Sequence, residues 1–300
     1  MIGHTSLVVR KQDHRRRSLL VLAVVVTLMM LLFVLPISAQ SPKPQVEKPS
    51  ESEETGQDDL INADRPGLAD GSSVIGPKRL QVETGFQEEF RHDVTSHEHT
   101  IFFPTLLRVG IDSHWEARIE GNTFVRTTTF ADVTNQSSGF APVSLGIKYQ
   151  ICDIKGRHEL SVGTIARVFP AWGSGDFRSQ HVTGDVRLVA DWNFAPRLKL
   201  ALNPNVGVGR YEDDQGRVFT AGLFAGTLNY LPTKKLNPFL DLGVQSPEQS
   251  NGKPAAIFDG GVAYIVGRDV QLDASIGTGV HGTTTPHPFI GFGISFRSKH

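Results

Sequence analysis

The chain has 300 residues, in which 30 Lys and Arg stand against 31 Asp and Glu. Residues 1–39 hold five of the basic side chains and one acid, so the remainder carries 25 basic and 30 acidic side chains, a net charge of −5. This balance argues against nucleic acid as a partner, because nucleic acids select basic surfaces. Thirty Gly and 18 Phe beside three Met favour strands and turns over helices. Cys152 is the single cysteine, which excludes an internal disulfide and a cysteine-rich zinc site.

Residues 1–39 have the pattern of a secretory signal peptide. Three arginines at positions 15–17 precede an apolar run over residues 19–35, and Pro36-Ile37-Ser38-Ala39 follows. A basic start, an apolar core and small residues at the cut are typical of such signals, so we predict cleavage after Ala39. An uncleaved membrane anchor is the alternative, because the apolar run is slightly longer than a usual signal core. Both interpretations predict export from the cytoplasm.

Residues 40–62 are predicted to form a disordered linker. The segment contains three prolines and a cluster of acidic side chains between Glu51 and Asp59. It has almost no apolar side chains, so it cannot bury enough surface to offset the entropy lost on folding.

Residues 78–297 repeat one pattern, in which apolar and polar side chains alternate over segments of roughly ten residues, the length a tilted strand needs to cross a bilayer. About 12 such segments follow one another. The first sets one apolar face against one polar face: Leu80, Val82, Phe86 and Phe90 against Gln81, Glu83, Gln87 and Glu89. The third places four apolar residues on one face: Trp115, Ala117, Ile119 and Val125. The segment 219–230 is apolar on both faces and cannot be oriented from its pattern.

The connections between these segments alternate between short and long. The short ones are 111–114, 153–157, 193–197, 231–235 and 267–269, and the long ones are 91–98, 127–142, 171–180, 211–217, 245–254 and 282–288. Outer-membrane barrels have short periplasmic turns and longer outer loops, with both chain ends in the periplasm. A soluble β-sandwich, which alternation alone also allows, has no reason to sort its loops in this way. The sequence therefore predicts an all-β fold, an antiparallel transmembrane up-and-down β-barrel of about 12 strands over residues 78–297.

The polar faces of the predicted strands carry both signs of charge and are expected to line the lumen. The candidate pore-lining residues are Glu83, Arg108, Glu116, Arg118, Glu120, Lys148, Arg167, Asp185 and Arg187. Any one of them is expected to serve in an ion pair across strands. Together they would suit small polar or amphiphilic solutes better than a single ion type.

The histidines do not form a recognisable catalytic or metal motif. His97-Glu98-His99 lacks the i, i+4 histidine pair of a helical zinc site. His158 and Ser161 are three residues apart on a predicted strand, which would place their side chains on opposite faces. We therefore expect no enzymatic activity, no cofactor and no metal. An outer-membrane hydrolase built on a barrel, and a structural or adhesive barrel, are the alternative functions.

The stretch that precedes the first strand carries the most specific motif. Asp64-Arg65-Pro66-Gly67 is followed by Gly76-Pro77 and then by the run from Leu80 to Phe86. This arrangement resembles the start of the bacterial family named for the MetA pathway of phenol degradation, whose organisation would cover residues 62–297. Members of that family are outer-membrane β-barrels described as transporters of small organic, often aromatic, compounds. The resemblance implies facilitated diffusion of such compounds through the lumen, with membrane lipid and the barrel-assembly machinery as partners. The chain departs from the usual aromatic ending of such barrels, because four residues follow Phe296.

Residues 63–77 are predicted to be an N-terminal plug or latch. Pro66 stiffens the approach to the barrel, and Gly67 would permit a sharp reversal of the chain. The charges of Asp64 and Arg65 could pair with the mixed-sign lumen. Two hypotheses follow: residues 64–76 fold back and narrow the pore, or they form a latch against the periplasmic rim.

Overall fold

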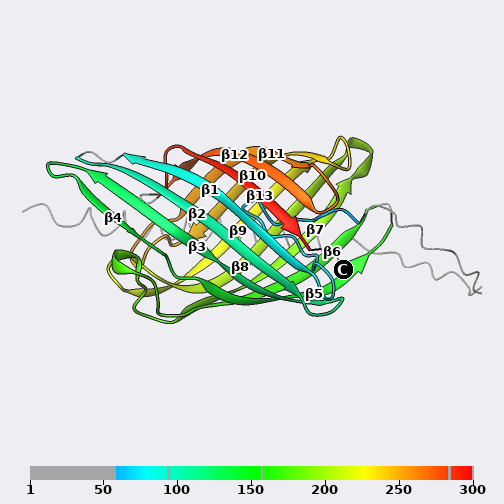
Figure 1. The fold of residues 1–300 in the computed structure, drawn as a ribbon, viewed down its shortest axis with the longest axis horizontal. Helices are drawn as coiled ribbons and strands as arrows, with labels where there is room; N and C mark the ends of the chain where they lie inside the picture. Colours follow the sequence, from blue (N-terminus) through cyan, green and yellow to red (C-terminus); the bar gives the residue numbers. More distant parts are fainter. Residues whose placement is uncertain (1–58, 93–94, 157, 283–284, 299–300) are drawn as a thin grey trace, which may run out of the picture. The chain divides into compact units, whose positions relative to one another are not determined.

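The computed structural model describes residues 59–92, 95–156, 158–282 and 285–298, and the predicted signal peptide and most of the predicted linker lie outside this part. Thirteen strands of the described part form one antiparallel sheet, which closes on itself through the pairings β1–β13 and β2–β3 (Figure 1). Their bounds are β1 (Leu80–His92), β2 (His97–Gly110), β3 (Trp115–Phe130), β4 (Asn135–Gly139), β5 (Ser144–Ile154), β6 (Leu160–Phe169), β7 (Thr183–Ala195), β8 (Leu200–Glu212), β9 (Val218–Tyr230), β10 (Leu236–Ser246), β11 (Ala255–Ile265), β12 (Val270–His281) and β13 (Phe289–Arg297). The predicted barrel is confirmed.

Twelve of these strands go around the barrel, and β4 is an addition to the far half of β3. β4 pairs with residues 125–129 of β3, whereas β5 pairs with residues 115–120 of the same strand. The connection between β6 and β7 covers the other edge of β4, where Phe140 N donates to Ser174 Oγ at 2.8 Å and Ser174 N donates to Phe140 O at 3.1 Å. A loop therefore completes the wall where the strand ladder stops.

The short connections lie at the end of the barrel where β1 begins and β13 ends, which is the periplasmic end in outer-membrane barrels. The outer loops are shorter than predicted, because the strands run further. β1 and β2 extend to His92 and His97, and β3 and β4 occupy much of the segment 127–142. The only helical pieces in the described residues are two 3-10 turns, η1 (Gly175–Phe177) and η2 (Pro196–Leu198). Within the same part of the chain, no helix has the length and apolar character needed to cross a membrane.

Apolar side chains face outward and polar ones inward along the barrel wall. Val168 of β6 is 50% exposed, whereas Arg167 beside it is 7% exposed. The orientation of β9, which could not be predicted from its sequence, follows the same alternation. Leu228 and Tyr230 are exposed on the outer face, and Thr227 is buried on the inner face. An apolar exterior over a polar interior is stable only where lipid surrounds the wall.

The prediction for Val125 was wrong, because a β-bulge reverses the alternation in β3. In the β2–β3 pairing, Phe102 faces Val125 but Pro104 faces Asn122, so β3 holds one extra residue. Beyond that point the faces exchange. Val125 is consequently buried in the lumen at 6% exposure, and Phe124 takes the outward position at 41%.

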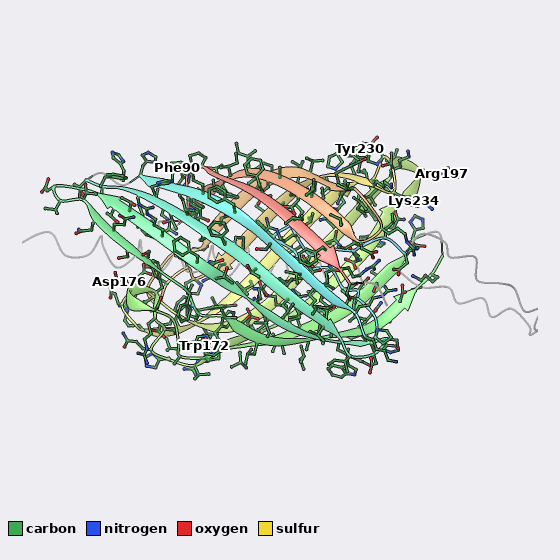
Figure 2. The ribbon with its side chains drawn as sticks, in the orientation of Figure 1. Phe90, Trp172, Asp176, Arg197, Tyr230 and Lys234 are labelled. Atoms are coloured by element: carbon green, nitrogen blue, oxygen red, sulfur yellow. The ribbon has the colours of Figure 1, made fainter. Side chains whose placement is uncertain are left out.

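Aromatic side chains gather on the outer surface near both ends of the wall. In Figure 2, Phe90 and Trp172 lie toward one end, and Tyr230 lies toward the other, with Arg197 and Lys234. Trp115 and Tyr149 add to the group at the periplasmic end, with ring centroids 4.5 Å apart. Such bands mark the two membrane interfaces of a spanning barrel.

Candidate solute pathway and its plug

The segment that precedes β1 enters the barrel and returns within it. At the periplasmic end, Arg297 Nη1 donates to Asp59 Oδ1 at 3.0 Å, and the buried Ile61 donates its N–H to Arg268 O at 2.7 Å. The chain reaches its deepest point near Leu68, whose N–H donates to Asp241 Oδ2 at 2.9 Å. Asp59 and Ile61, which fall in the predicted linker, therefore already contact the barrel. We call residues 63–77 the plug.

The return path ends in the turn predicted at Gly76-Pro77. Gly76 has φ of +84° and Lys78 has φ of +57°, both left-handed. Gly67, by contrast, has no positive φ, so the chain turns near Leu68 without a left-handed glycine. A glycine suits this position for another reason: a Cβ on Gly67 would lie 3.1 Å from Thr227 Oγ1 and 3.5 Å from Asp241 Oδ2. The plug packs closely against the wall at this point, and Pro66 precedes it in the lining of the periplasmic half of the lumen.

Side chains of the wall hold the main chain of the plug. Arg65 N donates to Glu83 Oε2 at 2.9 Å, and Ile75 N donates to Glu116 Oε2 at 3.1 Å. Arg108 donates to the carbonyl oxygens of Asn62 and Ser73, both at 3.0 Å. The N–H and C=O groups of an irregular segment have no partners on a neighbouring strand. Buried side chains of the wall must therefore form hydrogen bonds with them. The polar side chains of the lumen therefore hold the plug in place in addition to keeping the lumen hydrated.

Asp64 is the centre of a cluster of buried cations. Its carboxylate lies 2.5 Å from Arg118, 2.9 Å from Lys148 and 3.7 Å from Arg108. These three wall side chains are nearly inaccessible to solvent. Burial alone would raise the pKa of Asp64, but Arg108, Lys148 and Arg118 outweigh it and hold that pKa far below its usual range. The carboxylate is therefore ionised at neutral pH.

Asp70 is the plug residue that sequence reasoning missed. It lies 2.8 Å from Arg118 and 3.3 Å from Arg187, so it joins β3 to β7 through the plug. Its only sequence signal was its place six residues after Asp64, within the stretch that already carried the family motif. Ser72 also escaped prediction, although its N–H and hydroxyl both donate to Asp191 Oδ2 of β7, at 2.9 and 2.6 Å.

The opposite side of the lumen presents carboxylates to the plug. Arg65 lies 3.2 Å from Asp273 of β12. Asp241 of β10 and Asp259 of β11 are direct cross-strand partners, and within the described residues neither forms an ion pair. The plug therefore places two acids toward a cationic wall and one arginine toward an acidic wall.

The remaining predicted pore-lining residues form a second network in the wall. Arg167 lies 2.7 Å from Glu120 and 2.7 Å from Asp185, and Arg187 lies 3.3 Å from Asp185. Glu120 is the most accessible of them, with 34% of its side chain exposed. Arg187 links this network to the plug through Asp70.

The plug separates two cavities of about 360 Å³ each. The lower chamber, at the periplasmic side, is lined mainly by polar side chains, including Asp191, Asn193, Asn203, Asn229 and Asn237. The upper chamber is lined by Leu68 of the plug together with apolar and charged wall residues that include Leu223, Ile257, Glu89, Arg91 and Arg187. Asn62 to Gly67 line the lower chamber, so the tip of the plug is the partition between the two.

Replacing Gly110 with alanine is expected to dislodge the end of the plug. A Cβ on Gly110 would lie 1.6 Å from Gly76 O, a contact that only a shift of the backbone can relieve. We expect the heat-modifiable form of the variant to unfold at a lower temperature on a denaturing gel than the wild type. Gly267→Ala is the matched control, because a Cβ there meets nothing within 4 Å. Equal unfolding temperatures for the two variants would contradict the close contact.

The histidine groups noted in the sequence stay apart from this network. His97 and His99 lie at the outer end of β2, where His99 Nε2 is 2.6 Å from Glu88 Oε1. His158 Nδ1 bonds Phe194 O, whereas Ser161 Oγ donates to Cys152 O, so the two do not form a dyad. In the part of the chain that the structure describes, three or more His, Cys, Asp or Glu side chains are nowhere grouped as metal ligands.

A closed wall with an apolar exterior and a charged lumen defines an outer-membrane β-barrel of the porin-like class. The chain belongs to the family described as "Putative MetA-pathway of phenol degradation", whose model matches residues 63–298. The resemblance predicted from residues 64–86 is thereby confirmed.

Solved structures resemble the chain at low sequence identity, and the first of those reported below shares its fold. The COG4313 outer membrane channel from Pseudomonas putida F1 is 9% identical, with a TM-score of 0.60 over 76% of this chain and 98% of that chain. The translocator domain of the autotransporter NalP from Neisseria meningitidis is 13% identical, with a TM-score of 0.45 over 73% and 88%. The CymD monoaromatic hydrocarbon channel is 9% identical, with a TM-score of 0.37 over 75% and 89%. No curated protein matches the chain.

Proposed function

We propose that this protein is an outer-membrane channel for small organic solutes, which cross by facilitated diffusion while the plug controls the width of the lumen. In this proposal the mature chain reaches the outer membrane after cleavage of its signal peptide and is inserted by the barrel-assembly machinery. The family match and the likeness of the fold to the COG4313 outer membrane channel support a channel. We assign the predicted pore-lining residues to holding the plug and lining the path around it.

The observation that carries the proposal is the partition of the lumen. The tip of the plug separates two cavities, and the contacts that hold it are hydrogen bonds and ion pairs such as Leu68 N to Asp241 and Asp64 to Arg118. Contacts of this kind can exchange with water or with a polar solute. A segment latched against the rim would not reach Asp241 in the middle of β10. These positions favour the plug hypothesis over the rim latch.

A disulfide between the plug and the wall would test this function. A Cβ on Gly67 lies 3.1 Å from Thr227 Oγ1, close to the separation of a Cβ from the far sulfur of a disulfide. We expect Gly67→Cys/Thr227→Cys, in a Cys152→Ser background, to pass small solutes into liposomes slowly when oxidised and faster when reduced. The Cys152→Ser protein alone is the control and should not respond to reductant.

Equal solute flux in the oxidised and reduced double variant would show that the plug does not control passage through the lumen. Loss of all conductance and solute flux in every form, with heat-modifiable migration intact, would remove the channel itself. A structural or adhesive barrel would then be the better interpretation.

A further inference from the structure

The upper chamber has two chemically different sides. Its apolar side comes from the plug tip and from β9 and β11: Leu68, Leu223, Ala225, Ala255 and Ile257. Its charged side comes from β7 and β1, through Arg187, Arg91 and Glu89. Gly207 lets the side chain of Arg187 lie directly against β8, because a Cβ there would lie 2.9 Å from the Cγ of Arg187. A chamber built in this way matches a molecule with an apolar body and one polar head.

Two cations line this chamber, Arg91 and Arg187, and the buried Nε of each has no hydrogen-bond partner in the described structure. Arg187 is the one whose acidic partners lie closer to other cations. Its two ion pairs, with Asp70 and Asp185, are both 3.3 Å long. Each of those acids has a shorter partner elsewhere: Asp70 lies 2.8 Å from Arg118, and Asp185 lies 2.7 Å from Arg167. A guanidinium favours bidentate binding of a carboxylate, and Arg187 lacks such a partner.

The other charges at the chamber limit which acid can enter. Arg91 lies 3.2 Å from Glu98 and 3.9 Å from Glu89, and among the described residues neither of these acids has a closer cation. Glu89 also lines the chamber, and its carboxylate would repel a second negative charge on a ligand. The surroundings therefore select a molecule with a single acidic group.

We propose that the upper chamber binds a small amphiphilic monocarboxylic acid, whose carboxylate replaces Asp70 on Arg187 and whose body lies against Leu68, Leu223 and Ile257. This inference rests on the proposed channel function and names the class of solute that the plug recognises. Binding frees Asp70 from Arg187, so Asp70 keeps its ion pair with Arg118, and Ser72 remains a contact of the plug with β7. The solute thus weakens one of the contacts that hold the plug in its path.

Calorimetric titration of the purified full-length barrel with benzoate and hexanoate tests this site. We expect Arg187→Gln to weaken binding of both acids by about tenfold or more, the usual effect of losing a charge-assisted hydrogen bond. Asp70→Asn should tighten binding, because it removes the carboxylate that competes for Arg187. Arg210→Gln is the matched control, since Arg210 is exposed two residues beyond the outward-facing Val208 of β8. It should bind benzoate as the wild type does.

Benzyl alcohol and hexanol, which keep the apolar body and lack the charge, should bind more weakly than the two acids. Unchanged benzoate affinity in Arg187→Gln, weaker binding in Asp70→Asn, or equal affinity for acid and alcohol would each overturn the proposal. Heat-modifiable migration of every variant shows whether its barrel is folded. Flux of neutral solutes through the reduced Gly67→Cys/Thr227→Cys protein reports on the channel separately, so failure of this site is distinguishable from failure of the proposed function.

Discussion

Replacing Asp64 with asparagine is expected to release the plug and raise the single-channel conductance of the purified barrel several-fold. Asparagine keeps the shape of the side chain but removes the charge that balances Arg108, Arg118 and Lys148. Removing one partner of a buried ion pair costs about 3–5 kcal/mol, because the remaining charge stays desolvated. The plug can avoid most of that cost by leaving the lumen, where water then solvates the cations.

The conductance of Asp64→Asn in planar bilayers should be compared with that of Asp132→Asn. Asp132 is exposed in the turn between β3 and β4, so the same change of side chain occurs away from the plug. We further expect the current through Asp64→Asn to favour anions, measured as a reversal potential across a salt gradient. A folded Asp64→Asn barrel with wild-type conductance would show that the ion pairs of Asp64 do not retain the plug.

Replacing residues 64–76 with a Gly/Ser chain of the same length should raise the conductance further. The upper and lower chambers, each about 360 Å³, would then join into one continuous lumen. We expect a larger effect than that of Asp64→Asn, because the hydrogen bonds from Leu68, Ser72 and Ile75 to the wall are lost as well.

The same replacement of residues 40–52, an equal length of the predicted linker, is the control and should leave the conductance unchanged. An unchanged conductance after replacement of 64–76 would instead support the rim latch. The plugless barrel is also expected to lose its heat-modifiable form at a lower temperature than the wild type, because Arg118 and Lys148 lose Asp64.

The barrel was predictable because every strand repeats the same physical signal. Val168 faces lipid and Arg167 faces the lumen, and Val82 and Glu83 alternate in the same way. The alternation of apolar and polar residues in the sequence follows directly from these two environments. Val125 could not be placed, since one extra residue in β3 reverses the alternation without changing its composition. The length of the outer loops could not be predicted for a similar reason. Thr127 to Phe130 lie in β3 although their composition is typical of a loop.

The charged residues of the site could be found, but their partners could not. Arg118 and Lys148 were predicted to line a lumen, and they do face inward, yet the strands give no sign that both bind Asp64. The reason is that the plug contacts the wall largely through main-chain groups, such as the N–H of Leu68 and the carbonyl of Ser73, which every residue type possesses. Asp70 was overlooked because the residues around it are equally compatible with a carboxylate in an ion pair and with a carboxylate in a solvent-exposed turn.

The opposed signs of the two lumen walls also act at a distance. On one side of the plug, Arg108, Arg118 and Lys148 outnumber the buried acids Glu83 and Glu116, so that a positive charge remains. On the other side lie Asp241, Asp259 and Asp273. When the plug moves aside, these groups create an electric field perpendicular to the barrel axis, in a narrow space with low-dielectric walls where fields are focused. A solute with a permanent dipole would be turned to align with that field before it reached the constriction. Orientation, as well as size, would then determine which molecules cross quickly.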